Sequence, residues 1–352
     1  MKQISVEVPS RCIGLDLSDE TSAFCMIDGH GDIVREGSIP MERSSVQVFF
    51  GAIEPCRVVL EASTQSRWVA KVIRALGHEV IVIHPRRLQL ISESVSKTDR
   101  NDARLLARVG RLDVGMLQPV YEKSDEGTVV RVQLGARRKL VVMRTRLVNF
   151  VRSSVKSFGA PLPSCSAEVF HKKAARLMPK ELRTVLAPML KVLGALQEEL
   201  AGYDEAVAKL CEKRFPETGV FRQIHGVGPV VALSFLTAIE DPKRFKSSRA
   251  VGAYLGLTPK SYQSGKSDPS LRISKQGDGV LRSLLVTAAT HILMRSAPDT
   301  DLKRHGKRLA KSGTKRDRAR ARIAVARKLA VLMHRLWLTG EAYDPLLSTR
   351  AA

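Results

Sequence analysis

Apolar residues in the first third of the chain fall into short runs separated by polar turns and amphipathic segments. The runs CIGLDLS (12–18), SAFCMID (22–28) and IVREGSI (33–39) predict three consecutive strands, with the turn-forming GHGD between the second and the third. A short helix at 46–53 precedes a fourth strand, RVVLEAS (57–63). A helix at about 68–76 stops at Gly77, and EVIVIHP (79–85) predicts a fifth strand that Pro85 ends.

The order of these elements indicates a fold class. Three strands followed by helix, strand, helix, strand and helix is the order of an α/β RNase H-like domain, which we expect over residues 1–115. In such a sheet the first and fourth strands are neighbours, and the last helix packs across them. The sequence therefore predicts that the ends of two strands and the start of one helix meet.

The rest of the chain is helical in pattern. Apolar residues recur at three- and four-residue steps through 116–215, and Pro161 and Pro163 interrupt them. At least two long helices are expected there, with an antiparallel coiled hairpin as one arrangement. We interpret the region as a linker and oligomerisation arm, although simple core packing explains the same pattern. The residue pattern over 216–340 predicts a third domain that is mostly α-helical.

The charge narrows the class of partner. Lys and Arg number 58 against 35 Asp and Glu, which leaves a net charge of +23. Such a field attracts polyanions, and nucleic acid is the commonest large one. Between residues 301 and 336 there are 13 Lys or Arg and two acids, an excess of 13 − 2 = +11. We expect Arg318, Arg320 and Arg322 in this run to bind nucleic acid.

Other features favour a cytoplasmic protein without a membrane partner. No run approaches the roughly 18 apolar residues that a membrane span needs. The N-terminal sequence lacks the apolar core of a signal peptide. The five cysteines are scattered without metal-binding spacing, which is typical of reduced thiols.

Four acids are candidates for a metal site. Asp16 lies in the first strand between Leu15 and Leu17, so it points away from them. Glu61 ends the fourth strand, and Asp99 and Asp102 lie three apart where a helix opens. Each alone has an ordinary explanation, as a turn or helix cap or a solvated strand end. In the predicted fold, however, they converge, and carboxylate oxygens suit Mg²⁺ or Mn²⁺.

Three motifs resemble one family of DNA-processing enzymes. GLDLS, LEAS and KTDRNDARLLA are similar to motifs of the DEDD transposases of insertion-sequence family one-ten, relatives of the Piv invertases. The resemblance implies a fold like the RuvC junction resolvases. It also implies that Asp16, Glu61, Asp99 and Asp102 are catalytic metal ligands.

The C-terminal half carries the same resemblance through AYLGLTP, SGK and ISKQGDGVLR. The family's nucleophilic serine maps onto Ser264, with Ser261 and Ser267 three residues away on either side. A serine that attacks a phosphodiester forms a covalent phosphoserine and conserves the bond energy for rejoining. A serine in a Gly- and Lys-rich loop is otherwise usually a turn residue.

Further residues are expected to hold phosphates. Gly226 and Gly228 form a GVG turn before a helix, where backbone N–H groups suit an anion, although a plain turn between packed helices fits equally well. Basic residues around the serine are expected to contact the DNA backbone; they are Lys260, Lys266, Arg272 and Lys275.

The sequence thus predicts a transposase or site-specific recombinase that acts on donor and target DNA. The resemblance implies a guide noncoding RNA and a homo-oligomer, either a dimer or a tetramer. One alternative is a junction-resolving nuclease that uses the acids and water and forms no covalent intermediate. Another is a non-catalytic nucleic-acid scaffold, against which four phosphate-repelling acids argue.

Overall fold

The computed structural model describes residues 9–85, 98–111, 119–263, 269 and 271–347. The chain divides into two compact units, Met1–Glu122 and Lys123–Ala352. The second unit contains both the predicted arm and the predicted C-terminal helical domain.

The first unit is built on a five-stranded mixed sheet of order β3-β2-β1-β4-β5. β1 pairs antiparallel with β2 and parallel with β4, β2 pairs antiparallel with β3, and β4 pairs parallel with β5. The predicted meander and crossover strands are therefore confirmed. The strands are β1 (Arg11–Asp16), β2 (Thr21–Asp28), β3 (Ile33–Pro40), β4 (Arg57–Glu61) and β5 (Glu79–Ile83).

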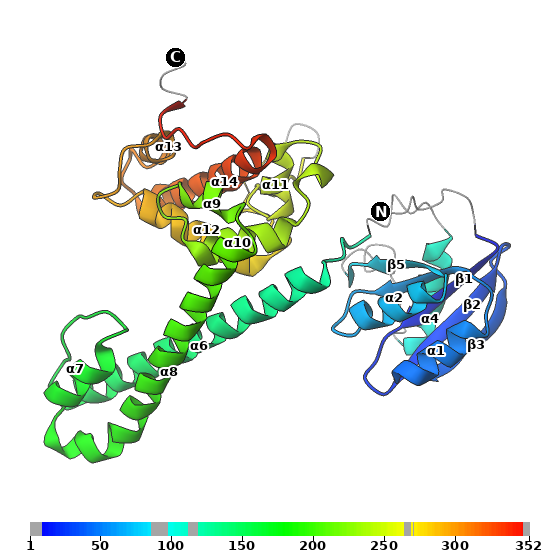
Figure 1. Cartoon of the computed structure of the whole chain (residues 1–352), viewed down its shortest axis with the longest axis horizontal. Helices are drawn as coiled ribbons and strands as arrows, with labels where there is room; N and C mark the ends of the chain where they lie inside the picture. The colour runs from blue at the N-terminus through cyan, green and yellow to red at the C-terminus, as the bar shows by residue number, and fades with distance from the viewer. Residues whose placement is uncertain (1–8, 86–97, 112–118, 264–268, 270, 348–352) are drawn as a thin grey trace. The chain divides into compact units, whose positions relative to one another are not determined.

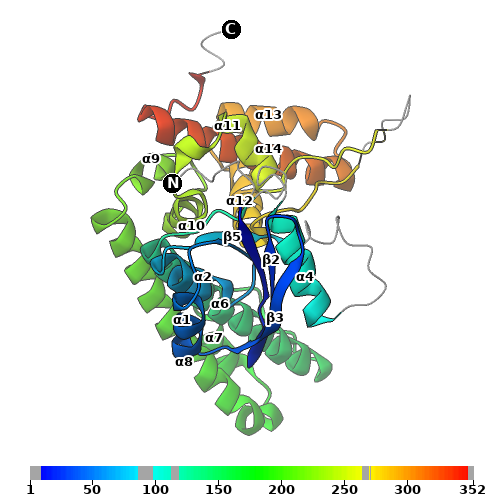
Figure 2. The same ribbon diagram turned by 90° about the vertical axis from the view of Figure 1, so that its right-hand side faces the viewer.

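Helices cover both faces of this sheet (Figures 1 and 2). Helices α1 (Arg43–Gly51) and α2 (Ser66–Ala75) bury one face, which includes Ile13, Leu15, Val58 and Leu60. Helix α4 (Asp99–Gly110) buries the opposite face through Ala103, Leu106 and Ala107. Alternate residues of β1, β2, β4 and β5 thus enter two separate cores, as the two-residue period of a strand requires, whereas β3 is mostly exposed.

The second unit begins with a helical hairpin (Figure 1). α6 (Asp125–Ser157) and α8 (Lys180–Lys213) pack along each other, and α7 (Phe170–Leu177) packs on α8 at the far end. The predicted interruption at Pro161 and Pro163 is confirmed, since both lie between α6 and α7. Phe170, Val151 and Leu193 belong to a small core at this end.

The remaining helices form one core around α10 and α14. Phe221, Phe235 and Leu329 are fully buried in it, and Phe221 makes an edge contact with Phe235. α12 and α13 both pack on α14. The elements are α9 (Thr218–Arg222), α10 (Pro229–Ile239), the 3₁₀ helix η1 (Pro242–Arg244), α11 (Ser248–Tyr254), α12 (Gly279–Ile292), α13 (Asp301–Leu309) and α14 (Lys315–Thr339).

None of the helices in the described part of the chain is long and apolar enough to cross a membrane. The five cysteines are free thiols, and burial raises the pKa of Cys12 to about 12. A buried thiol of that kind is unreactive at neutral pH.

Candidate functional site

Asp16 and Glu61 lie at the carboxyl ends of two neighbouring parallel strands. Leu15 of β1 is paired with Leu60 of β4, so the next residue of each strand is Asp16 and Glu61. Gly14 in β1 and Val59 in β4 lie on the face of the sheet that α4 covers. Asp16 follows Gly14 by two residues, and Glu61 follows Val59 by two residues, so both acids lie on that same face. The two carboxylates therefore share one face and one end of the sheet.

Helix α4 runs antiparallel to these strands, which brings its first turn to the same end. Its last residue, Gly110, lies at the start of the strands, where Arg57 Nη1 donates to its carbonyl oxygen at 3.0 Å. Its residues Ala103 and Ala107 lie over Gly14, in the middle of β1. The first turn, with Asp99 and Asp102, therefore extends toward the strand ends that carry Asp16 and Glu61.

The approach of α4 to β1 depends on glycine. A Cβ on Gly14 would lie 2.1 Å from the carbonyl oxygen of Ala103 and 2.3 Å from the backbone nitrogen of Ala107. A Cβ on Gly110 would lie 2.4 Å from Cys12 Sγ. These distances are far shorter than any van der Waals contact, so the helix backbone lies directly on Gly14, and Gly110 lies directly on the side chains of Cys12 and Val59.

The first turn of α4 is also fixed by side chains. Thr98 is the N-cap, and its hydroxyl accepts from the backbone N–H of Asn101 at 3.2 Å. Asp99 is therefore the first helical residue and not the cap. Glu36 of β3 forms ion pairs with both Arg100 and Arg104 of the helix. The hydrogen bond from Arg104 lowers the pKa of Glu36 to about 2, and Arg100 adds to the effect.

Asp16 and Glu61 lie at the strand ends, and Asp99 and Asp102 lie on the helix turn that extends toward this end of the sheet; we call these four acids the acidic cluster. Asp99 is exposed, whereas Asp16, Glu61 and Asp102 are partly buried. Asp16 and Glu61 each already have an interaction partner. Within the described ranges, no three His, Cys, Asp or Glu residues form a ready-made metal-binding group.

The segment that carries the predicted serine is anchored at both ends. Ser264, Ser267 and Lys266 lie outside the described residues. At the base of this serine loop (260–272), Lys260 N–H donates to Arg272 O at 3.0 Å, and Ser274 N–H donates to Thr258 O at 2.9 Å. The two arms thus form a short antiparallel ribbon. Ser261 and Lys260 are exposed next to this ribbon.

Two glycines let the arms of the loop pack closely on the end of α11. Gly256 (φ +65°) and Gly277 (φ +69°) are in the left-handed region that favours glycine. A Cβ on Gly277 would lie 2.1 Å from the carbonyl oxygen of Tyr254. Lys275, whose N–H donates to the carbonyl oxygen of Gly256 at 3.2 Å, also has a positive φ of 56°. The motifs LGLTP and ISKQGDG therefore specify the backbone that holds the loop.

Asp278 connects the exit of the loop to the arm. Its Oδ1 accepts from the backbone N–H groups of Val280 and Leu281 and caps α12, while its Oδ2 accepts from Arg131 of α6 at 2.8 Å. Burial raises the pKa of Asp278, but the hydrogen bonds from Leu281 and Arg131 outweigh it and lower the pKa overall. This carboxylate is therefore charged at neutral pH, where it joins α6 to α12.

The GVG turn has the geometry of a helix start. Gly226 has φ +86°, and Gly228 is the N-cap of α10. A cavity of about 570 Å³ adjoins the turn and is lined by Arg222, His225 and His291 among others. Gly226 also approaches α12, because a Cβ there would lie 2.9 Å from Ala288 O. Close helix packing thus requires this glycine.

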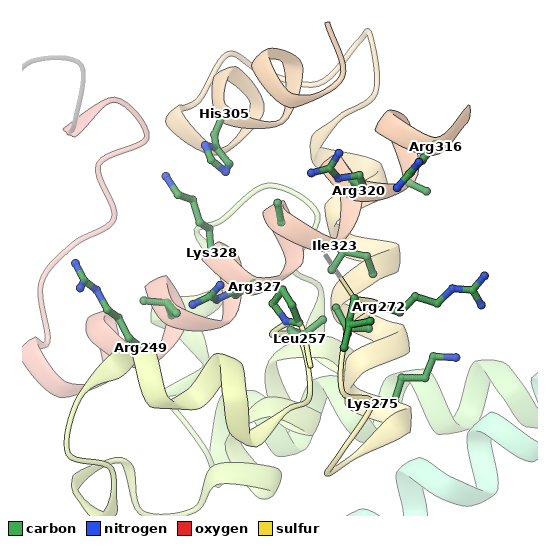
Figure 3. Close-up of a pocket in the computed structure, with 16 residues that line it drawn as sticks. Arg249, Leu257, Arg272, Lys275, His305, Arg316, Arg320, Ile323, Arg327 and Lys328 are labelled. Atoms are coloured by element: carbon green, nitrogen blue, oxygen red, sulfur yellow. The ribbon is translucent and has the colours of Figure 1, made fainter. Parts of the chain in front are cut away.

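Helix α14, most of which lies in the basic run 301–336, forms one wall of a larger cavity of about 1090 Å³, which we call the basic cavity (Figure 3). α14 contributes Arg316, Arg320, Arg327 and Lys328. Arg318 and Arg322 are exposed but do not line it. Two residues turn a helix by about 200°, so they lie on the opposite side of α14 from Arg320.

The other walls of the basic cavity come from segments far away in sequence. Arg272 and Lys275 extend from the arm of the serine loop that leads to α12, Arg249 from α11, and His305 from α13 (Figure 3). Burial lowers the pKa of His305, and Lys328 and Arg308 lower it further. Sequence reasoning missed the cavity and the Glu36 contacts. The only signal for the cavity in the sequence was the four-residue spacing of Arg316, Arg320 and Ala324, which puts them on one face of a helix.

Comparison with known proteins identifies the class to which these features belong. Residues 13–159 match the family model of the DEDD transposase of the IS110 type, described as a transposase. Residues 219–305 match the model described as Transposase IS116/IS110/IS902 family. Transposases are enzymes that bind DNA and cut and transfer its strands. The chain belongs to the IS110/IS116/IS902 family of transposases.

Relatives along most of the chain support this assignment. The transposase for insertion sequence element IS1111A of Coxiella burnetii is 27% identical over 95% of this chain and 91% of its own length. The y4pF/y4sB protein of Sinorhizobium fredii, also named as a transposase, is 30% identical over 86% of this chain and 78% of its own length. A Pseudomonas aeruginosa protein named as a family 20 transposase is 29% identical over 82% of this chain and 86% of its own length.

Proposed function

We propose that this transposase cleaves and rejoins DNA strands with a divalent metal centre on the acidic cluster and with Ser264 as nucleophile. The observation that supports the proposal is the antiparallel course of α4 over β1 and β4, because the first turn of the helix, with Asp99 and Asp102, extends toward the strand ends that carry Asp16 and Glu61. The strand order, with β1 beside β4 and the last helix across them, supports an RNase H-like domain of the RuvC type.

The chemistry of the acidic cluster fits a hard cation. A DEDD transposase domain implies a divalent metal, and the four candidates offer only carboxylate oxygens, the donors that Mg²⁺ and Mn²⁺ prefer. A bound metal would polarise the phosphate and neutralise charge on the attacking and leaving oxygens. The carboxylates themselves would hold that metal and accept a proton.

Ser264 would attack the scissile phosphate through its hydroxyl oxygen. A bond forms between Oγ and phosphorus, the bond to the leaving DNA oxygen breaks, and that oxygen takes a proton. A serine at its ordinary pKa needs a base or a metal to take up its hydroxyl proton, and the acidic cluster would provide it. The phosphoserine then keeps the bond energy for rejoining. The paired arms at 258–260 and 272–274 support a loop held in a defined place.

The proposed partners are donor and target DNA, a guide noncoding RNA and further copies of the chain. The net charge of +23 suits several nucleic-acid strands. Lys260, Arg272 and Lys275, next to the loop, are the proposed phosphate contacts there, together with the turn at Gly226 and Gly228. Exposed apolar side chains along the arm support its role in oligomerisation; they include Val129, Val132, Val142, Met143 and Phe150 on α6 and Val185 and Val192 on α8.

The test of the serine is a substrate that traps a covalent intermediate. A nicked suicide substrate incubated with the wild-type protein and Mg²⁺ is expected to give a protein–DNA adduct that survives SDS. Peptide mass mapping should locate the adduct at Ser264. Ser264→Ala should lose both the adduct and recombination but keep DNA binding, because only one hydroxyl is removed.

The neighbouring serines provide matched controls. Ser261→Ala and Ser267→Ala remove the same group three residues away and should remain active. If Ser264→Ala still cuts DNA with Mg²⁺ and the wild type gives no adduct, water is the nucleophile and the serine mechanism is wrong.

A further inference from the structure

The basic cavity has a charged rim and no compensating acid. Seven of its sixteen lining residues are Lys or Arg, and none is Asp or Glu. Among the described residues, the single acid within ion-pair distance of these seven is Asp317, 3.9 Å from Arg320. Oδ2 of Asp317 accepts hydrogen bonds from Ser312 and Thr314, and Oδ1 is the atom near Arg320, so one carboxylate faces seven cationic side chains. The rim thus has unneutralised positive charge that suits a polyanion.

The floor of the basic cavity is aliphatic. Leu257 is almost fully buried there, and Ile273, Ile323 and Val331 are partly buried. Figure 3 shows the basic side chains arranged around Leu257 and Ile323. Recognition sites of about 300–1,000 Å³ with an apolar lining and a few polar groups hold molecules of small-ligand size. The volume of about 1090 Å³ therefore has room for a nucleotide.

We propose that the basic cavity binds an unpaired nucleotide of the nucleic-acid substrate, with its phosphates on the arginine rim and its base against the aliphatic floor. The inference rests on the proposed function, since it assigns a substrate subsite to the same enzyme. Its wall includes Pro259, Arg272 and Ile273, the residues that join the two arms of the serine loop. A nucleotide bound in the cavity would therefore contact the base of that loop directly.

A base-paired nucleotide does not fit this combination of groups. In a duplex the bases are stacked and paired, so only phosphates and sugars would reach the rim and the apolar floor would stay uncovered. An unpaired base exposes a planar face, which guanidinium groups and apolar side chains contact regardless of sequence. His305, uncharged at neutral pH because its pKa is lowered, adds one donor and one acceptor for the base edge.

The rim is tested by two double variants, each of which removes two positive charges from one of two opposite faces of α14. R316Q/R320Q removes two charges from the cavity, and R318Q/R322Q removes two charges from the opposite side of the same helix. Glutamine is a good helix former, so both variants should fold alike. The probe is a fluorescent single-stranded oligothymidylate, with an oligouridylate and a DNA duplex of the same length in parallel, measured by fluorescence anisotropy.

R316Q/R320Q should bind the single strands at least about tenfold more weakly than R318Q/R322Q does, because it loses charge-assisted hydrogen bonds as well as charge. The two variants should bind the duplex alike. Equal weakening of single-strand binding by both would mean that the cavity adds only to the general positive field, and the proposal would be wrong. The DNA and RNA strands show which backbone the cavity prefers.

The floor is tested with Ala324→Leu, which narrows the cavity without a change of charge. Ala324 is partly exposed and lines the cavity. The variant should weaken binding of oligothymidylate about tenfold, the value of one stacked base. It should leave binding of an abasic strand of the same length unchanged. An equal effect on both strands, or no effect on either, would contradict a base in the cavity.

These measurements are independent of the serine test. They use equilibrium binding without Mg²⁺, so a protein with no adduct at Ser264 would still show the difference between the faces of α14. An adduct at Ser264 together with equal behaviour of the two double variants would reject the nucleotide subsite and leave the proposed function intact.

Discussion

Gly14 of β1 lies so close to Ala103 of α4 that a Cβ on the glycine would come within 2.1 Å of the alanine carbonyl oxygen. This contact fixes how far α4 stands from the sheet. The same helix carries Asp99 and Asp102 in its first turn, and β1 ends at Asp16. The distance between three members of the acidic cluster therefore depends on a residue that has no side chain.

Gly14→Ala should loosen α4 and abolish strand cleavage. The added methyl group must displace helix backbone, and overpacking of this kind costs about 1–3 kcal/mol. Hydrogen exchange of the α4 amides should accelerate accordingly. Gly51→Ala is the control, because a Cβ there meets nothing within 4 Å and should leave exchange in α4 unchanged. Unchanged exchange in Gly14→Ala would show that α4 is not held by this contact.

Glu36→Gln should weaken the attachment of α4 in a pH-dependent way. The folded-state pKa of Glu36 is about 2, below its ordinary value of 4.5. Its ion pairs therefore stabilise the fold fully above about pH 4.5, and this contribution is lost as the pH falls toward 2. At neutral pH the variant should be less stable by about 1 kcal/mol. The difference in unfolding free energy should vanish near pH 2, and a constant difference from pH 7 to 2 would contradict this account.

Much of the fold was predictable from the sequence because strand and helix periods differ. The short apolar runs in CIGLDLS and RVVLEAS, and the glycines and prolines that end elements, located all five strands and the helices between them. Asp16 and Glu61 were singled out because each interrupts an apolar run, and Asp99 and Asp102 because they open a helix; their role as one metal site remains a prediction. Arg318 and Arg320 were both predicted to bind nucleic acid from charge density alone, but they lie on opposite sides of α14, and only Arg320 lines the basic cavity.

Contacts between distant segments were not predictable. Arg131 and Asp278 are 147 residues apart, and nothing in either neighbourhood indicates the other. The basic cavity likewise combines α11, α13, α14 and the arms of the serine loop. Such sites depend on tertiary packing, which a one-dimensional pattern does not contain.

Arg131→Met should reduce strand cleavage about tenfold without a change in DNA affinity. It removes the bond from α6 to Asp278, so the exit of the serine loop loses a constraint, and small displacements of catalytic groups cost roughly this much or more. Arg137→Met is the matched control, because Arg137 pairs with Asp204 inside the arm. Single-turnover cleavage rates and binding isotherms separate the two effects. An equal loss of rate in both variants would point to the arm as a whole.

Nucleic-acid binding should depend strongly on salt. Neutralised phosphates release counterions, so log K falls with log salt by roughly 0.9 per contact on B-DNA. Replacement of Arg318, Arg320 and Arg322 by Ala should flatten this slope by about one to three units. The slope from titrations at several salt concentrations is the measurement, and an unchanged slope would show that this segment faces something other than nucleic acid.

The most direct test of the central claim is the metal dependence of strand cleavage in the wild type, Asp16→Asn and Asp102→Asn. Each asparagine keeps the shape of the aspartate and removes its charge, so folding and DNA binding should persist. The account predicts cleavage by the wild type with Mg²⁺ or Mn²⁺, none in EDTA, and none by either variant with any metal. Full cleavage in EDTA, or by both variants with Mg²⁺, would contradict a metal centre on the acidic cluster.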